Sequence, residues 1–253
     1  MLFTAEQYII MREGYCYCDR NCRFEILPTP ELNQQFVRQY IGIFPRAIPK
    51  NYLKGTNLRQ FELIVQAVFA DVNYAESNDS ITSNHVANLK EIFCAIVHWK
   101  MASQGGRAVK NVDNVRNKWK NETLMQVING YRERNLSLLE VGGVRIPTAT
   151  AFLRFLFPDE YGIMDSRVVK ITQRKNITEL NLRKNNGYIL DVEKNRGQYY
   201  RNYNLFLVNE ARHLNSLGIL FQDEDEKGNQ IKYKFRPCDI EMALWASDQI
   251  LNN

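Results

Sequence analysis

Apolar residues recur at helical spacing in several parts of this chain, and that spacing constrains its fold most strongly. The clearest segments are 57–72 (NLRQFELIVQAVFADV), 85–101 (HVANLKEIFCAIVHWKM) and 148–157 (TATAFLRFLF). A helix brings residues with this spacing to one face, which is then buried against other elements. Further helices are predicted at 31–41, 113–134, 166–174, 198–216 and 238–251. The predicted fold class is all-α.

Two segments depart from the helical spacing. Residues 219–235 (ILFQDEDEKGNQIKYKF) hold two short β-prone runs around a polar turn that contains Gly228, which predicts an exposed β-hairpin near the C-terminus. Residues 176–202 are rich in Asn, Lys, Arg and Tyr and have weak periodicity. They indicate an insertion or a binding loop.

The start of the chain and its overall composition bear on its location. With 253 residues and 45% hydrophobic composition, the chain is able to bury a sizeable core. It has no uncharged apolar stretch of about 18 residues, the length that a membrane-spanning helix needs. Glu6, Arg12 and Glu13 stand where a signal peptide is apolar. We therefore expect a cytoplasmic protein with no membrane partner.

The cysteines favour ordinary reduced thiols. Cys16, Cys18 and Cys22 lie together in GYCYCDRNCRF, and the chain has five cysteines in all. An odd number without a secretory signal argues against a disulfide framework. No second CxxC or HxxxH pattern completes a tetrahedral zinc site, so no metal or cofactor is predicted. A metal or redox role for the three clustered cysteines is the alternative.

Positive charge is concentrated in the middle of the chain. Residues 100–201 hold 19 Lys and Arg against 10 Asp and Glu, a net charge of +9, whereas the remainder holds 14 against 18, a net charge of −4. A basic region attracts anionic partners such as nucleic acid. A solvated basic face is the commoner meaning of such a charge distribution.

Two glycines and a proline precede the helix predicted at 148–157. Gly142 and Gly143 allow a tight turn and leave backbone N–H groups unobstructed at the positive end of the helix, where anions bind. Pro147 suits the first turn, because its missing N–H costs nothing there. In a basic chain the expected anion is phosphate. Arg145 and Thr148, at the same helix start, are the other predicted phosphate contacts.

These residues resemble a known motif. VGGVRIPTATAFL (141–153) aligns without a gap with the helix-hairpin-helix consensus of the DNA glycosylase superfamily that includes endonuclease III and the adenine-specific mismatch glycosylase, roughly LPGVGRSTAGAIL. The identical positions are Gly143, Val144, Thr148, Ala149, Ala151 and Leu153. The continuation YGIMDSRVVKI is similar to the family's FPILDGNVKRV segment, and it places Asp165 eighteen residues after Pro147.

The resemblance implies a two-lobed helical fold that holds double-stranded DNA with an extruded base. Residues 75–165 would form a helical barrel that ends in the hairpin. Residues 1–74 and 166–253 would form the second lobe, and both lobes belong to a single unit that spans 1–253. The implied activity is that of a DNA N-glycosylase in base excision repair, which removes a damaged, mismatched or modified base. It implies a monomer without a cofactor.

The chain also departs from the family pattern. Arg145 replaces the second glycine of the hairpin, where it adds a possible phosphate contact. Pro147 stands where bifunctional members carry the Schiff-base lysine, so the resemblance implies a monofunctional enzyme. The four-cysteine iron–sulfur loop of some members is missing, because Cys238 alone lies beyond position 94.

The chemistry of the reaction gives Asp165 a role. Breaking an N-glycosidic bond builds positive charge on the sugar, as in glycoside hydrolysis. A nearby carboxylate stabilises this charge and also orients or deprotonates the attacking water. Asp165 is therefore the predicted catalytic residue. The alternative is that it only caps the helix at 166–174, whose dipole favours the ionised carboxylate.

Base removal also requires the nucleotide to leave the duplex and enter a pocket. Trp99, Lys100 and Tyr161 are candidate pocket residues, with Trp119 as a further aromatic. Arg167 and Lys170 flank Asp165 and are predicted to contact phosphates. Core packing or simple surface charge is the alternative for each of these side chains.

Two other functions stay open at this point. One is a non-catalytic DNA-binding module that keeps the hairpin and has lost the chemistry. The other is a helical interaction protein whose basic surface contacts an acidic partner.

Overall fold

The structure is a computed structural model, and it describes residues 1–15, 58–101, 106–139, 144–175, 177, 184–185, 188–189, 196–225 and 229–250. The helices in these ranges are α1 (Ala5–Glu13), α3 (Leu58–Ser77), α4 (Ser83–Met101), α5 (Gly106–Lys118), α6 (Asn121–Arg132), α7 (Leu136–Leu139), α8 (Ile146–Leu156), α9 (Ser166–Arg174), α10 (Arg196–Ser216) and α11 (Pro237–Ile250). The strands there form two antiparallel pairs, β1 (Lys184–Asn185) with β2 (Tyr188–Ile189) and β3 (Leu220–Glu224) with β4 (Gln230–Lys234). The described chain is thus mostly helical with a small hairpin near its C-terminal end, which confirms these two predictions.

Most predicted helices are present within a few residues of their predicted bounds. The exception is 113–134, which was predicted as one helix and forms two, α5 and α6. The break falls at Trp119 and Lys120, where the backbone of Lys120 is extended (φ −80°, ψ 172°). Trp119 is buried against Phe93, with ring centroids 5.6 Å apart, so tertiary packing overrides the local spacing. The helix predicted at 31–41 lies outside the described residues.

The sequence spacing did not predict α1, which is short. Its start has a readable signal, because Thr4 and Gln7 form a capping box: the Thr4 hydroxyl accepts from the Gln7 N–H, and the Gln7 side chain accepts from the Thr4 N–H. Two residues of this helix, Tyr8 and Met11, are fully buried. Its partners, α11 and β3, come from the other end of the chain.

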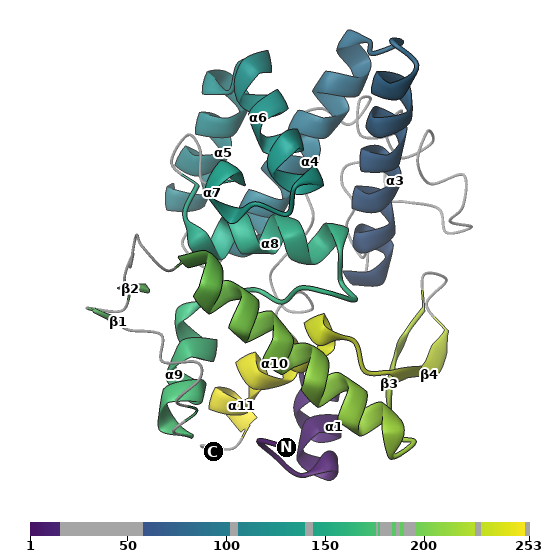
Figure 1. The fold of residues 1–253 in the computed structure, drawn as a ribbon, viewed down its shortest axis with the longest axis vertical. Coiled ribbons are helices and arrows are strands. Elements are labelled where there is room, and N and C mark those ends of the chain that lie inside the picture. Colours follow the sequence, from purple (N-terminus) through teal and green to yellow (C-terminus); the bar gives the residue numbers. More distant parts are fainter. Residues whose placement is uncertain are drawn as a thin grey trace.

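The helices form two groups with α8 between them (Figure 1). On one side α8 contacts α3, α4 and α7, and on the other side α11 packs against α1, α9 and α10. Helix α3 begins before residue 75 and packs against α4 and α8. The division into sub-lobes at residues 75 and 165, and the glycosylase-like architecture, stay predictions.

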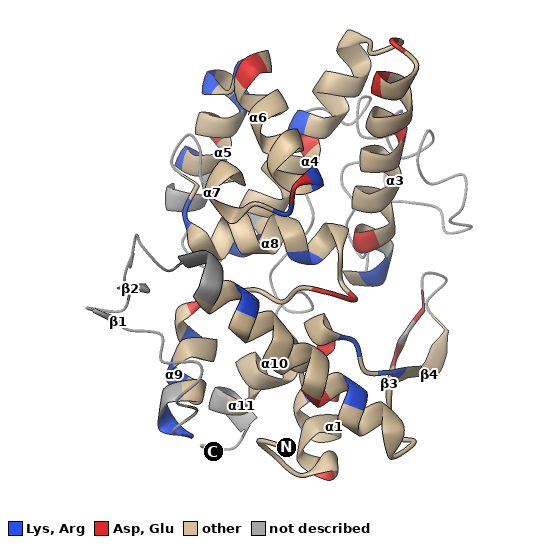
Figure 2. Ribbon diagram, in the orientation of Figure 1, with Lys and Arg blue, Asp and Glu red and all other residues tan. Residues whose placement is uncertain are grey.

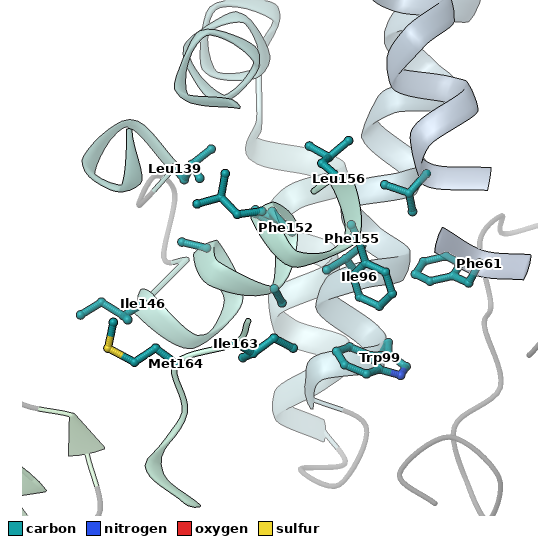
Figure 3. Close-up of a cluster of buried hydrophobic side chains, with 14 of the residues drawn as sticks. Phe61, Ile96, Trp99, Leu139, Ile146, Phe152, Phe155, Leu156, Ile163 and Met164 are labelled. Carbon is teal, nitrogen blue, oxygen red and sulfur yellow. The ribbon is translucent and has the colours of Figure 1, made fainter. Parts of the chain in front are cut away.

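Apolar side chains surround α8. Every residue of this helix except Pro147 is buried, which explains why its sequence is apolar on more than one face. Phe155 meets Phe61 of α3 and Trp99 of α4 edge to face, each at 4.9 Å between ring centroids. Figure 3 shows this cluster, with Ile163 and Met164 of the following loop beneath α8.

Charged side chains are buried where α1, α3, α8 and α11 meet. Glu62 of α3 pairs with Arg154 of α8 at 2.7 Å and with Arg236 at 2.8 Å. Asp239, in the first turn of α11, pairs with Arg236 at 2.9 Å and with Arg12 of α1 at 3.0 Å. Burial would raise the pKa of Asp239, but the guanidinium groups hold it well below its ordinary value. We call these five residues the ion network.

The hairpin of β3 and β4 is buried on one face only. Its register pairs Leu220 with Lys234 and Glu224 with Gln230. Phe221 is 1% exposed, and the Arg12 guanidinium lies 4.6 Å from its ring centroid, so α1 covers this face. Most of β4 is exposed, in agreement with the predicted exposed hairpin.

Candidate functional site

Asp165 stands at the start of α9, where its side chain caps the helix. Its Oδ1 accepts hydrogen bonds from the backbone N–H groups of Arg167 at 2.9 Å and Val168 at 3.1 Å. Its carbonyl oxygen accepts the first hydrogen bond of the helix, from Val169. The capping role expected from the sequence is therefore present, and it fixes the direction of the carboxylate.

Lys100, in the last turn of α4, reaches the same carboxylate. Its Nζ lies 2.9 Å from Asp165 Oδ2, and both side chains are 12% exposed. Burial alone would raise the pKa of Asp165, but the Lys100 ammonium and the two backbone N–H groups together lower it below its ordinary value. Asp165 is consequently ionised at neutral pH. The structure thus brings together two of the predicted site residues, which are 65 positions apart in the chain.

The loop that leads into Asp165 is tied to α8. Thr150 of α8 donates its hydroxyl to the Ile146 carbonyl and accepts a hydrogen bond from the Met164 N–H at 3.1 Å. Thr150 is fully buried, so this link is shielded from water. The position of Asp165 therefore depends directly on the helix that follows the glycine turn.

Helix α10 holds the same loop from the other side. The Tyr200 hydroxyl donates to the Gly162 carbonyl at 3.1 Å, and the Tyr203 hydroxyl donates to the Ile163 carbonyl at 3.0 Å. Asn204 Oδ1 accepts from the Gly162 N–H at 3.0 Å. The sequence reasoning did not find these three residues. The sequence feature that indicates them is the run YYRNYN (199–204), in which side chains with polar groups recur on the buried side of a helix.

The hairpin residues are described in part. Gly142 and Gly143 lie outside the described residues. Arg145 is exposed, adopts an extended conformation (φ −111°, ψ 169°) and is the N-cap of α8, with Pro147 in the first turn as expected. Thr148 is 8% exposed. Of the predicted phosphate contacts at this helix start, Arg145 is therefore the accessible side chain.

Basic residues continue along α9 (Figure 2). Arg167 is exposed and its guanidinium lies 4.4 Å from the ring centroid of Trp245 on α11. Lys170 follows on the next turn and is partly exposed. Both cations lie on the helix that Asp165 caps, and their contact with phosphate stays a prediction.

The aromatic candidates for a base pocket differ in burial. Trp99 and Trp119 are 3% and 2% exposed and belong to the apolar core, as Figure 3 shows for Trp99. Tyr161 is partly exposed and stacks on Tyr200 with ring centroids 5.7 Å apart. Core packing, the alternative interpretation, describes the two tryptophans. Tyr161 is the candidate that keeps an accessible ring.

A cavity of about 360 Å³ lies away from Asp165. Its lining comes from α3, the end of α6 with the following turn, and the end of α8: Gln66, Phe69, Ala70, Asn73, Arg132, Arg134, Leu156 and Phe157. None of the predicted site residues lines it. The candidate site is therefore the Lys100–Asp165 pair rather than this cavity, because two of the predicted site residues meet there.

The described residues hold neither a cluster of metal ligands nor a membrane-spanning helix. Within them, no three His, Cys, Asp or Glu side chains are grouped to hold a metal ion. Cys94 and Cys238 are buried free thiols, and burial raises the pKa of each to about 12. Cys16, Cys18 and Cys22 lie outside the described residues. No helix in the described ranges has the length and apolar character to cross a membrane.

In comparisons with protein-family models, curated proteins and solved structures, no match to this chain was found. Its function is therefore inferred from the residues and the geometry of the site.

Proposed function

We propose that the protein is a monofunctional DNA N-glycosylase that hydrolyses the bond between a damaged, mismatched or modified base and its sugar. The observation that carries this proposal is the connection between α8 and Asp165. The two parts of the motif, the helix after the glycine turn and the later aspartate, are joined by the hydrogen bond from the Met164 N–H to Thr150. The carboxylate is ionised, which is the state that the chemistry needs.

Asp165 is the catalytic residue of this proposal. It stabilises the positive charge that develops on the sugar and orients the attacking water. In the free protein the Lys100 ammonium neutralises this carboxylate at 2.9 Å. The mechanism therefore requires Lys100 to turn from Asp165 when DNA binds, and a DNA phosphate provides the competing anion.

The exposed cations around Asp165 support a DNA partner. Arg145 is the N-cap of α8, and Arg167 and Lys170 lie on α9, the helix that Asp165 caps. Phosphate contacts of this kind fix the position of the duplex, and the target nucleotide then leaves the stack. Tyr161 is the proposed aromatic contact of the extruded base. Such an enzyme acts in base excision repair.

One observation favours a second candidate, a non-catalytic DNA-binding module. Both oxygens of Asp165 already have partners, since Oδ1 caps α9 and Oδ2 pairs with Lys100. A carboxylate with these contacts is sufficient to hold α9 in place without any chemistry. In that case the cations would bind DNA and Asp165 would be purely structural.

An excision assay separates these two candidates. Duplexes that each carry one damaged, mismatched or modified base are incubated with wild-type protein, Asp165→Asn and Asp159→Asn, and abasic sites are cleaved with alkali. Asp159 is an exposed residue of the same loop and serves as the matched control. The glycosylase proposal expects alkali-dependent breaks with wild type and Asp159→Asn that disappear with Asp165→Asn.

The other outcomes have equally definite meanings. Salt-dependent binding by all three proteins without breaks on any duplex supports the non-catalytic module. No DNA binding at physiological salt rules out both candidates. Thermal unfolding of Asp165→Asn is measured alongside, so that loss of the α9 cap is not mistaken for loss of catalysis.

A further inference from the structure

A second carboxyl group is buried against the loop that leads into Asp165. Glu241 of α11 is 2% exposed, and its Oε2 has no hydrogen-bond partner among the described residues. A Cβ atom added to Gly162 would lie 2.8 Å from the Glu241 Cβ, so Glu241 packs directly against the loop that leads into Asp165. The backbone N–H of Ile163 in that loop also interacts with its carboxyl. An unsatisfied carboxyl oxygen in such a place is costly and needs a reason.

The two carboxyl groups have opposite environments. Asp165 has three donors, which are the Lys100 ammonium and the N–H groups of Arg167 and Val168. Glu241 has one backbone N–H and deep burial. Burial, with the charge of Asp165, raises the pKa of Glu241 to about 8, whereas the pKa of Asp165 is lowered. One proton is therefore held on Glu241 while Asp165 carries the negative charge.

The charged and titratable groups that act on Glu241 come from α4, α8, α10 and the start of α9. Lys100 of α4 and Arg154 of α8 favour its ionised form, and Asp165 opposes it. On α10, Tyr200 and Tyr203 also interact with it, and both hydroxyls donate to the loop carbonyls. The other cations that face α11 have partners of their own: Arg12 of α1 pairs with Asp239, and Arg167 of α9 lies over the Trp245 ring.

The two cations near Glu241 are not equivalent. Arg154 is fully buried and paired with Glu62 at 2.7 Å, within the ion network. Lys100 lies at the end of α4, and its side chain is 12% exposed. Lys100 is therefore the less buried of the two cations, and it lies outside the ion network.

We propose that Glu241 is a positioning residue for the Lys100–Asp165 pair. While Glu241 is protonated and neutral, it does not compete for the Lys100 ammonium, and Lys100 stays paired with Asp165. When it loses its proton it competes for the ammonium and draws Lys100 away, so the Asp165 carboxylate becomes available to another partner. This holds whatever reaction takes place at Asp165, and it therefore extends beyond the proposed function.

Carboxyl signals in nuclear magnetic resonance test the proposal without DNA. Protein labelled with ¹³C at Asp and Glu carboxyls is titrated from about pH 6 to about pH 10, on both sides of the raised pKa. In the wild type, the Glu241 signal should titrate near its raised pKa, and the Asp165 signal should shift with the same midpoint. In Glu241→Gln, which keeps the shape of the neutral acid, the Asp165 signal should stay flat over this range.

Glu210→Gln is the matched control. Glu210 is another buried carboxyl and is 8% exposed. It accepts hydrogen bonds from the Tyr8 hydroxyl and the Leu2 N–H, which belong to the start of the chain rather than to the surroundings of Asp165. This variant should keep the wild-type titration of Asp165.

Three results would overturn the proposal. The first is titration of Glu241 at its ordinary pKa. The second is an Asp165 signal that does not shift while Glu241 titrates. The third is an alkaline shift of the Asp165 signal that is the same in Glu241→Gln as in the wild type. The first two are measured on the wild-type protein, so they decide the question even if the variant fails to fold. A failure in the excision assay leaves these signals unaffected, which keeps the two proposals separable.

Discussion

The two sides of α8 are held together by different chemistry. Around α3 to α8, apolar and aromatic side chains such as Phe152 and Phe93 pack with ring centroids 5.0 Å apart. Where α1 and α11 meet α3 and α8, the ion network places Arg12 and Asp239 at 4% and 0% exposure. Apolar packing loses stability gradually as atoms are removed, because neighbours relax. A buried charge that loses its partner stays uncompensated, because neighbouring groups do not relieve it by small movements. Removal of one member of the ion network should therefore lose most of the stability that the network contributes.

Removing a partner from the ion network should have the largest effect. Asp239→Ala leaves the Arg12 and Arg236 guanidinium groups without their shared carboxylate, and we expect a loss of about 3–5 kcal/mol in the free energy of unfolding. Urea denaturation measures this loss. A cost below about 1 kcal/mol would remove the proposed difference between the two regions.

The Glu241 carboxyl should make stability depend on pH. Its pKa is raised in the folded protein, so its contribution is fully present below the ordinary pKa of Glu and is lost as the pH rises through about 8. Glu241→Gln should reduce the fall in unfolding free energy between about pH 5 and pH 9 by roughly 2–4 kcal/mol. Denaturation of both proteins at the two pH values measures it. Parallel falls would show that Glu241 titrates normally.

Trimming the apolar side should cost less and should not depend on pH. Ile96 of α4 is fully buried in the cluster of Figure 3, and Ile96→Val removes one methylene. We expect a loss of about 0.5–1.5 kcal/mol, equal at about pH 5 and pH 9. A loss that changed with pH would mean that the apolar cluster is coupled to the buried charges.

An exposed ion pair should contribute least. Arg134 and Glu160 pair at 2.8 Å, but their side chains are 46% and 48% exposed. Glu160→Ala should change the unfolding free energy by less than about 0.5 kcal/mol. Measured beside Asp239→Ala, this variant shows how much of the large effect is due to burial rather than to charge.

Sequence spacing predicted most helices because each amphipathic pattern is local. The start of α9, and the place of Asp165 directly before it, followed from one aspartate before SRVVKIT. The break at Trp119 was not predictable, since it depends on the contact with Phe93. Helix α1 was missed because its partners lie more than 200 residues away.

The candidate site divides in the same way. Asp165, Arg167 and Lys170 are neighbours in sequence, and one pattern identifies them. Lys100 was predicted as a pocket residue, but its contact with Asp165 depends on how α4 packs in the folded protein. Nothing in the sequence around Glu241 indicates that its carboxyl lies against Gly162, because such a contact depends on how α11 packs. The catalytic function of this site stays a prediction.

The pairing of Arg12 with Asp239 has a consequence for the order of events during synthesis. The two residues are 227 positions apart, so Arg12 leaves the ribosome long before its partner exists. The helices α3 to α8 find their neighbours within a shorter stretch and are able to assemble first. Contacts between distant residues also slow folding. The half of the molecule that contains Asp165 should therefore close last, when α11 emerges and α1 docks against it.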